Sequence, residues 1–126
     1  MEREYKPAGW PQVVPRIVVE DVAGLVAFLR EVFGARGEYR ETGPSELRIG
    51  ESLLMLSEPG PRAMFRAFLY VYVPDADATY RRALEHGARS IEPPADMPYG
   101  DRRAMVEDHW GNTWQIATHR RPFGAT

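Results

Sequence analysis

The sequence predicts an α+β fold made of two βαβββ modules, and an internal repeat is the main reason. In each half of the chain an aspartate precedes a helical pattern and a glycine follows it. Asp21 and Asp75 are 54 residues apart, and Gly34 and Gly87 are 53 residues apart. One β-rich segment precedes each helix and three follow it, which is typical of an internal duplication. The alternative is an unrelated ferredoxin-like α+β sandwich.

The first half begins, after an irregular arm over residues 1–11, with an expected strand over residues 12–19. This stretch is rich in β-branched residues, and Pro15 favours an edge position or the start of a strand. Asp21 is the expected N-cap of a helix over residues 22–33, whose apolar positions recur at helical spacing. Three short strands then follow between turns that contain glycine: residues 37–41, 46–49 and 52–57.

The second half repeats this order after a break rich in proline and glycine. Residues 67–73 read as a strand, and Asp75 caps a helix that ends near His86. Residues 90–92 form a short strand that runs into a loop at Pro93 and Pro94. The predicted boundaries within one structural domain are therefore an arm at 1–11, modules at 12–58 and 67–118, a linker at 59–66 and a tail at 119–126.

A β-hairpin closes the second module. Two apolar-rich runs, 103–107 and 113–117, flank the turn-forming residues 108–112. Asp and Asn side chains bond back to the local backbone and Gly supplies a positive φ, so this cluster should reverse the chain. The β-branched and aromatic residues on both sides favour paired strands.

The composition excludes several classes of function. The apolar fraction of 44% and the charged fraction of 27% are ordinary for a globular protein, and a net charge of −2 gives no footprint for nucleic acid. There is no cysteine, which excludes disulfides, thiolate metal sites and a thiol nucleophile. Neither a signal peptide nor a span of about 20 apolar residues is visible, so we expect a cytoplasmic protein with no membrane partner.

The hairpin, with Tyr99 and Gly100 just before it, resembles the closing hairpin of the vicinal oxygen chelate superfamily. That superfamily includes glyoxalase I, extradiol dioxygenases, fosfomycin-resistance enzymes and bleomycin-binding proteins. It usually has proline where this chain has His109, and the resemblance covers about residues 12–118. The resemblance implies that the sheets of the two modules curl into a cup with the helices outside. It also implies a homodimer.

The same resemblance locates the positions of the superfamily's metal ligands. Carried over by residue, they fall on Val14, Met55, Phe68 and Gln115. Valine and phenylalanine offer no lone pair, and a thioether suits soft ions such as Cu(I). We therefore expect no metal and no other cofactor.

Strand alternation predicts what lines the cup instead. Residues two apart share a face, and the opposite faces are aliphatic, as suits packing under helices. An arginine in such a cup can hold a carboxylate or phosphate, or stack on a ring. We also place two residues of the loop before the hairpin, Tyr99 and Arg102, at the site. The other candidate ligand-binding residues are Arg16, Leu53, Met55, Phe68, Tyr70, Tyr72, Thr113 and Gln115.

The leading hypothesis is a binding protein of the bleomycin-resistance kind, which sequesters a planar or aromatic small molecule. The ligand can be anionic if Arg16 contacts it. One alternative is a metal-independent lyase or isomerase that uses Tyr70, Tyr72 or Glu20 as an acid–base group. Another alternative is a scaffold protein whose cup is filled by its own aromatic side chains and whose role is association with other proteins. The three histidines, His86, His109 and His119, are expected to have ordinary surface roles.

Overall fold

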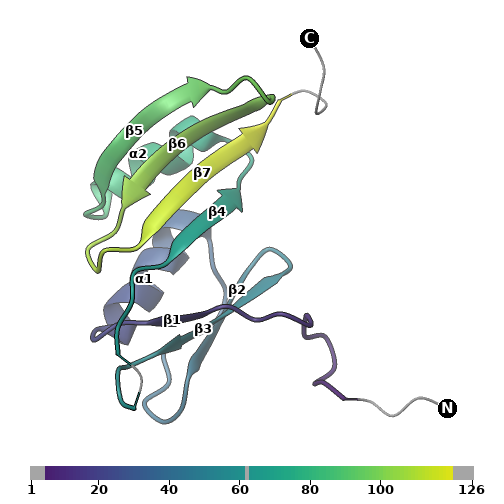
Figure 1. Ribbon diagram of the computed structural model, residues 1–126, viewed down its shortest axis with the longest axis vertical. Coiled ribbons are helices and arrows are strands. Elements are labelled where there is room, and N and C mark those ends of the chain that lie inside the picture. Colours follow the sequence, from purple (N-terminus) through teal and green to yellow (C-terminus); the bar gives the residue numbers. More distant parts are fainter. Residues whose placement is uncertain (1–4, 62, 121–126) are drawn as a thin grey trace, which may run out of the picture.

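The computed structural model describes residues 5–61 and 63–120, which form two β-sheets and two α-helices (Figure 1). The first sheet has the strand order β1-β3-β2 and the second has the order β4-β7-β6-β5. No helix of the described residues is long and apolar enough to cross a membrane. The elements in chain order are β1 (Arg16–Val18), α1 (Val22–Phe33), β2 (Ser45–Ile49), β3 (Ser52–Ser57), β4 (Phe68–Tyr72), α2 (Ala76–Glu85), β5 (Arg89–Asp96), β6 (Asp101–Glu107) and β7 (Thr113–His119).

The two sheets repeat one topology, which confirms the predicted α+β fold. In each sheet the first strand runs parallel to the last, β1 to β3 and β4 to β7. The last strand then pairs antiparallel with the strand before it. Figure 1 shows both helices on the far side of the sheets, so each sheet has one helix-covered face and one outer face.

The two modules share one hydrophobic core. Buried residues of α1 pack in the same cluster as buried residues of β3 and β7. The rings of Phe33 and Trp114 lie 5.1 Å apart between their centroids, which joins the end of α1 to β7. Because this cluster spans both halves, the modules form a single packed body.

Both helices begin and end as the sequence predicts. The Asp21 carboxylate accepts a hydrogen bond of 2.9 Å from the Gly24 amide, and Asp75 accepts one of 3.1 Å from Ala78. These contacts satisfy amides that lack a partner in the first turn. Gly34 ends α1 in the left-handed conformation, with φ at 67°.

The expected strand over residues 37–41 is absent from the part of the chain that the structure describes. An isolated bridge between Arg36 and Arg48 is the pairing found near this segment. Gly37 then takes a φ of 127°, and a Cβ there would lie 2.4 Å from the Glu46 carbonyl oxygen. The chain thus leaves the sheet at a backbone conformation that favours glycine, and the first sheet has three strands.

Prolines account for two further differences between the predicted and the observed strand bounds. β1 is shorter than residues 12–19, because Pro15 can accept a hydrogen bond from Met55 but has no amide to donate. β5 is longer than residues 90–92 and runs through Pro93 and Pro94. It lies at the edge of the second sheet with two register shifts, and edge strands tolerate proline.

Asp108 organises the turn between β6 and β7. Its carboxylate is buried and accepts hydrogen bonds of 2.8–3.0 Å from four donors. The donors are the amides of Trp110 and Asn112, the Asn112 side chain and the Trp114 indole. Asn112 also accepts from the amide of Ala67, which places the start of β4 against the turn. The predicted hairpin is confirmed.

Candidate functional site

A row of aromatic side chains covers the outer face of the second sheet. Phe68, Tyr70 and Tyr72 project from β4 and are 66%, 38% and 61% exposed. Thr113 and Gln115 of β7 lie opposite Phe68 and Tyr70 in the register and share this face. We call these five residues the aromatic face. The alternating residues of β4 pack against the core on the helix side, so the predicted register of the strand is confirmed.

A groove borders the aromatic face where β4 forms the edge of its sheet. Its volume is about 950 Å³. Its walls come from the segment before β1, from the turn between β2 and β3, and from β4. Three of the predicted ligand-binding residues, Leu53, Tyr70 and Tyr72, line it. The groove therefore joins the tyrosines of one module to the β2–β3 turn of the other.

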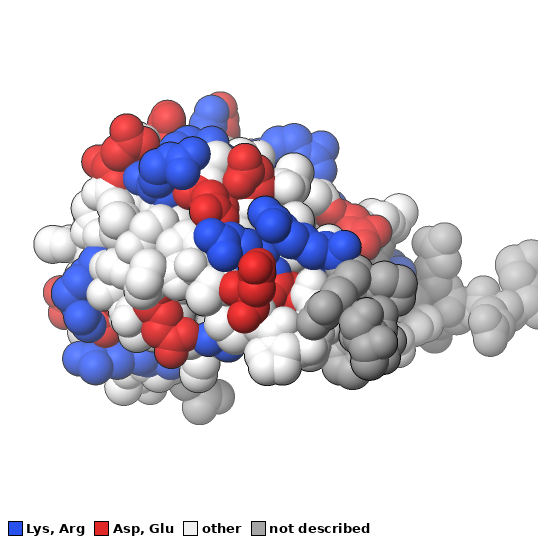
Figure 2. All heavy atoms as spheres, turned by 90° about the horizontal axis from the view of Figure 1, so that it is seen from above, with Lys and Arg blue, Asp and Glu red and all other residues white. Residues whose placement is uncertain are grey.

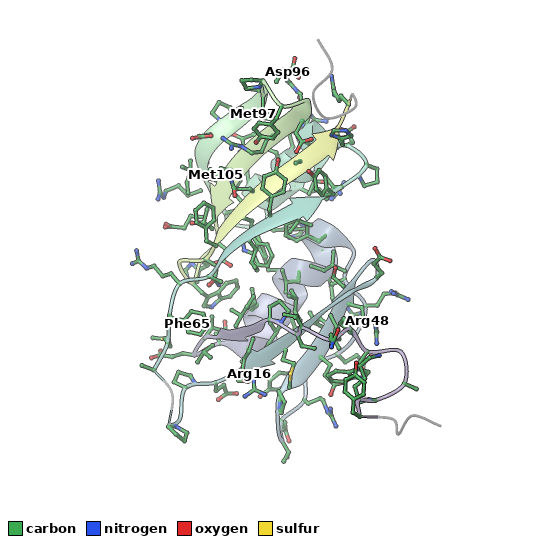
Figure 3. All side chains as sticks on the ribbon, turned by 45° about the vertical axis from the view of Figure 1, so that its right-hand side comes forward. Arg16, Arg48, Phe65, Asp96, Met97 and Met105 are labelled. Atoms are coloured by element: carbon green, nitrogen blue, oxygen red, sulfur yellow. The ribbon has the colours of Figure 1, made fainter. Side chains whose placement is uncertain are left out.

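Arg16 and Met55 lie on the outer face of the first sheet. They are paired across β1 and β3, and Nη2 of Arg16 is 3.8 Å from the Met55 sulfur. The helix side carries Ile17, so the predicted register holds here as well. Neither Arg16 nor Met55 lines the groove. Figure 3 shows Arg16 on the first sheet, away from the second sheet where Met105 is labelled.

Tyr99 and Arg102, which the sequence places together in one loop, lie on different sides of the second sheet. The Tyr99 hydroxyl is 3.3 Å from the Tyr70 hydroxyl, beside the aromatic face. Arg102 belongs to β6 and binds Asp77 of α2 through two contacts of 3.0 and 3.1 Å. Its guanidinium therefore links the sheet to its covering helix. The binding role of the predicted residues stays a prediction.

The structure brings together a polar cluster that the sequence analysis did not find. Asp101 is 2% exposed and stands at the start of β6 on the outer face. Its Oδ2 accepts hydrogen bonds from the hydroxyls of Tyr70, at 2.5 Å, and Tyr72, at 2.9 Å. Nδ1 of His119 lies 2.7 Å from the other carboxylate oxygen. We call these four residues the Asp101 cluster.

The sheet order explains how β4 reaches this cluster. β7 lies between β4 and β6, so the two tyrosines must cross β7 to contact Asp101. The β7 residue opposite Tyr72 is Ala117, which is small and fully buried. A larger side chain there would stand in the path of the phenol rings. The hydroxyl ends of the aromatic face are thereby fixed on Asp101.

The hydrogen bonds determine the charge states within the Asp101 cluster. Burial alone would raise the pKa of Asp101, but the bonds from Tyr70, His119 and Tyr72 outweigh it, and the pKa is lowered. Burial and the bond to Asp101 raise the pKa of Tyr70, and the same bond raises that of Tyr72. Asp101 is therefore a carboxylate and both tyrosines are protonated donors.

Arg103 lies next to the Asp101 cluster on the same strand face. It forms an ion pair with Glu92 and donates to the Tyr99 hydroxyl at 3.4 Å. Its Nε is buried and has no hydrogen-bond partner among the described residues. Burial alone would lower the Arg103 pKa, but the bond to Glu92 outweighs it and the pKa is raised. The site thus has a fixed positive charge beside the tyrosines.

The residues that the resemblance places at the superfamily's metal positions do not fit a divalent ion. Val14 and Met55 belong to the first module, and Phe68 and Gln115 lie on the aromatic face. One amide oxygen and one thioether are the donors of this set, which is too few for a hard or borderline cation. Within residues 5–61 and 63–120, no group of three or more His, Cys, Asp or Glu side chains could hold a metal ion.

The charge distribution near the second sheet is mixed. Figure 2 shows acidic and basic side chains interspersed on the surface seen from above, with no continuous region of one sign among the described residues. Such a surface offers no electrostatic track for a polyanion.

The chain is similar to known proteins in both sequence and architecture. Residues 11–116 match the family model of the Glyoxalase/Bleomycin resistance protein/Dioxygenase superfamily. The chain belongs to this superfamily. An uncharacterized protein of Mycobacterium bovis is 30% identical, with 84% of this chain and 82% of the relative covered.

Solved structures of the superfamily have the same fold. TioX from Micromonospora sp. ML1 is 25% identical with a TM-score of 0.75, and the match covers 86% of this chain and 98% of TioX. A glyoxalase/bleomycin resistance protein/dioxygenase family enzyme from Burkholderia phytofirmans PsJN is 19% identical with a TM-score of 0.72. That match covers 84% of this chain and 96% of the enzyme. The ferredoxin-like alternative is thereby excluded.

Proposed function

We propose that this protein binds a small planar or aromatic molecule against the aromatic face. The observation that carries the proposal is the groove of about 950 Å³, whose wall includes Tyr70 and Tyr72. Small-molecule sites are concave and mostly apolar, with a few polar groups that orient the ligand. Tyrosine rings supply stacking surface, and here their hydroxyls are held by Asp101. A protein of the bleomycin-resistance kind would sequester such a ligand without transforming it.

The binding is proposed to need no metal. The donor set at Val14, Met55, Phe68 and Gln115 supports this, because it lacks the imidazole and carboxylate ligands that zinc, iron or manganese prefer. Recognition would then depend on stacking, on shape and on hydrogen bonds from the edge of the groove.

The second candidate is a metal-independent enzyme of the lyase or isomerase type. The observation that favours it is the Asp101 cluster, since a buried carboxylate bonded to a histidine and two tyrosines can orient an acid–base group. Glu20, which the sequence also suggested for this role, is exposed in the segment between β1 and α1.

Native mass spectrometry of freshly purified protein tests the proposal first. The expected spectrum contains the chain with a retained organic molecule and without a stoichiometric metal ion. A panel of planar aromatic carboxylates and phenols is then titrated. Bare protein that also binds no compound of the panel would contradict the proposal, and turnover of a bound compound would favour the enzyme.

Variants then locate the site. Tyr72→Leu should weaken binding by about tenfold through lost stacking. Tyr39→Leu is the control, because Tyr39 is also an exposed tyrosine, at 40%, but lies outside the groove. For an anionic ligand, Arg16→Ala tests whether the first sheet contributes. Loss of a charge-assisted bond there would lower affinity by about ten- to a hundredfold.

A further inference from the structure

His119 and Asp101 face each other at one end of the aromatic face. They are paired directly across β7 and β6, so their side chains project from the same side of the sheet. Because the Asp101 carboxylate can only accept, the His119 Nδ1 carries the proton of their 2.7 Å bond. In the neutral ring the second nitrogen, Nε2, presents a lone pair on the opposite edge of the imidazole. The His119 side chain is 43% exposed, whereas the Asp101 side chain is 2% exposed.

This geometry resembles the arrangement by which enzymes orient a basic histidine. A buried carboxylate fixes the tautomer and the ring direction and stabilises the positive charge that forms when Nε2 takes a proton. Here Tyr70 and Tyr72 hold the other carboxylate oxygen, so Asp101 cannot rotate away. Both tyrosines bind Oδ2, so His119 is the side chain that binds Oδ1, and the exposed edge of its imidazole stays open to solvent.

The cluster also lies within reach of the proposed ligand. Tyr72 and His119 contact the two oxygens of one carboxylate, so the imidazole is a neighbour of the Tyr72 phenol. Tyr72 lines the groove and is 61% exposed. Neither Asp101 nor His119 lines the groove, so a ligand has to extend from the exposed Tyr72 ring along the outer face to reach Nε2 of His119.

We propose that His119 and Asp101 form a proton-accepting subsite, at which an acidic hydroxyl group on a planar ligand transfers its proton to Nε2 of His119. In this step the ligand O–H bond breaks and an Nε2–H bond forms, while the electron pair stays on the ligand oxygen. Nothing is oxidised or reduced. The ligand is then held as an oxyanion beside an imidazolium whose charge Asp101 balances. The subsite rests on the proposed function and defines its ligand class as phenol-like.

The surrounding charges are compatible with this transfer. Arg103 adds a positive charge on β6, which favours an oxyanion nearby, and Glu92 of β5 neutralises part of it. The tyrosine hydroxyls stay protonated and do not compete as bases. Among the described residues, the titratable and charged groups around the subsite are Tyr70 and Tyr72 of β4, Asp101 and Arg103 of β6, Glu92 of β5 and Tyr99 of the loop before β6.

The test uses 4-nitrophenol, because its ionised form absorbs visible light. The absorbance of the probe is measured over a series of pH values with and without the full chain, so that its pKa is obtained in the free and in the bound state. Equilibrium dialysis measures binding independently of ionisation. We expect the bound probe to ionise with a pKa about one unit lower, a roughly tenfold change in the ratio of phenolate to phenol.

Three variants separate the possible outcomes. His119→Gln should still bind the probe in dialysis, but the bound probe should no longer ionise more readily than the free probe. Asp101→Asn should reduce the ionisation of the bound probe. His86→Gln, at the exposed C-cap of α2, is the matched control and should behave as the unmodified chain. Thermal melting verifies that each variant is folded.

Binding without ionisation in the unmodified chain, or equal ionisation in His119→Gln, would overturn the subsite and leave the proposed function standing. Absence of binding to the unmodified chain would overturn the subsite and would count against the proposed function for phenols.

Discussion

At the scale of single residues, Asp108 is the buried carboxylate on which the β6–β7 turn depends. Asp108→Ala would leave four donors, three of them in buried residues, without their acceptor. We expect the free energy of unfolding to fall by about 3 kcal/mol or more. Glu107→Ala is the matched control, because its ion pair with Arg89 is exposed and should contribute less than about 1 kcal/mol. Equal urea midpoints for the two variants would contradict this assignment.

The sequence predicted single residues well where alternation decides their side of the sheet. Tyr70, Tyr72 and Gln115 lie on the outer face, and Arg16 lies opposite Ile17, as period two requires. His119 was placed in a tail because it follows the apolar run, although β7 continues to it. Once the turn is fixed, the hairpin register sets position 101 opposite 119, so the pair could have been found by counting across the hairpin. The hydrogen bonds from the tyrosines to Asp101 could not be predicted in this way, because they depend on side chains that cross β7.

At the scale of elements, Arg102 and Asp77 join β6 to α2. The bond from Arg102 lowers the pKa of Asp77, although burial opposes this. A carboxyl whose pKa is lower in the folded chain stabilises it above the unfolded value of about 3.9, and this stability is lost as the pH falls through the folded pKa.

A double-mutant cycle with Asp77→Asn and Arg102→Gln should therefore give a coupling free energy of about 0.5–1 kcal/mol at pH 7. The coupling should vanish near pH 2. Asp96→Asn serves as the comparison, because Asp96 is 73% exposed and 3.5 Å from Arg102, and it should couple less. Coupling that persists in acid would show that the contact is not ionic.

The sequence predicted the wrong bounds for strands whose formation depends on contacts with other segments of the chain. Both helices have caps that can be recognised along the chain, and α1 has the expected bounds. The missing strand near Gly37 depends on a close approach to Glu46, a contact between segments that local propensity does not describe. β5 accepts two prolines because it is an edge strand, and its place in the sheet is a tertiary property.

At the scale of the whole molecule, the repeat and the hairpin motif were enough to predict the fold, because each module has the same internal order. They could not predict where the sheets lie relative to each other. That placement depends on packing between α1, α2 and Trp114, and it separates Arg16 from the tyrosines that the sequence analysis placed beside it. The sequence thus predicted which face of its sheet each candidate residue occupies, but not that these residues lie on two separate surfaces.

The same placement leaves β4 as an exposed edge strand with aromatic side chains on its outer face. Phe68, which does not line the groove, is 66% exposed, and β4 has one hydrogen-bonded neighbour in its sheet. Unpaired edges and apolar patches are commonly covered by a second copy related by a two-fold axis. We therefore expect a homodimer, with light scattering at micromolar concentration giving twice the chain mass of 14.3 kDa.

Phe68→Glu should shift this dimer towards the monomer, because a carboxylate buried in an apolar interface without a partner is strongly unfavourable. Its place on the exposed outer face should leave the fold of the single chain intact, which circular dichroism would verify. Arg81→Glu on the exposed surface of α2 is the control for a change of charge and should leave the mass unchanged. A monomer mass for the unmodified chain would defeat the dimer. A dimer that survives Phe68→Glu would move the interface away from β4, to another edge such as β1.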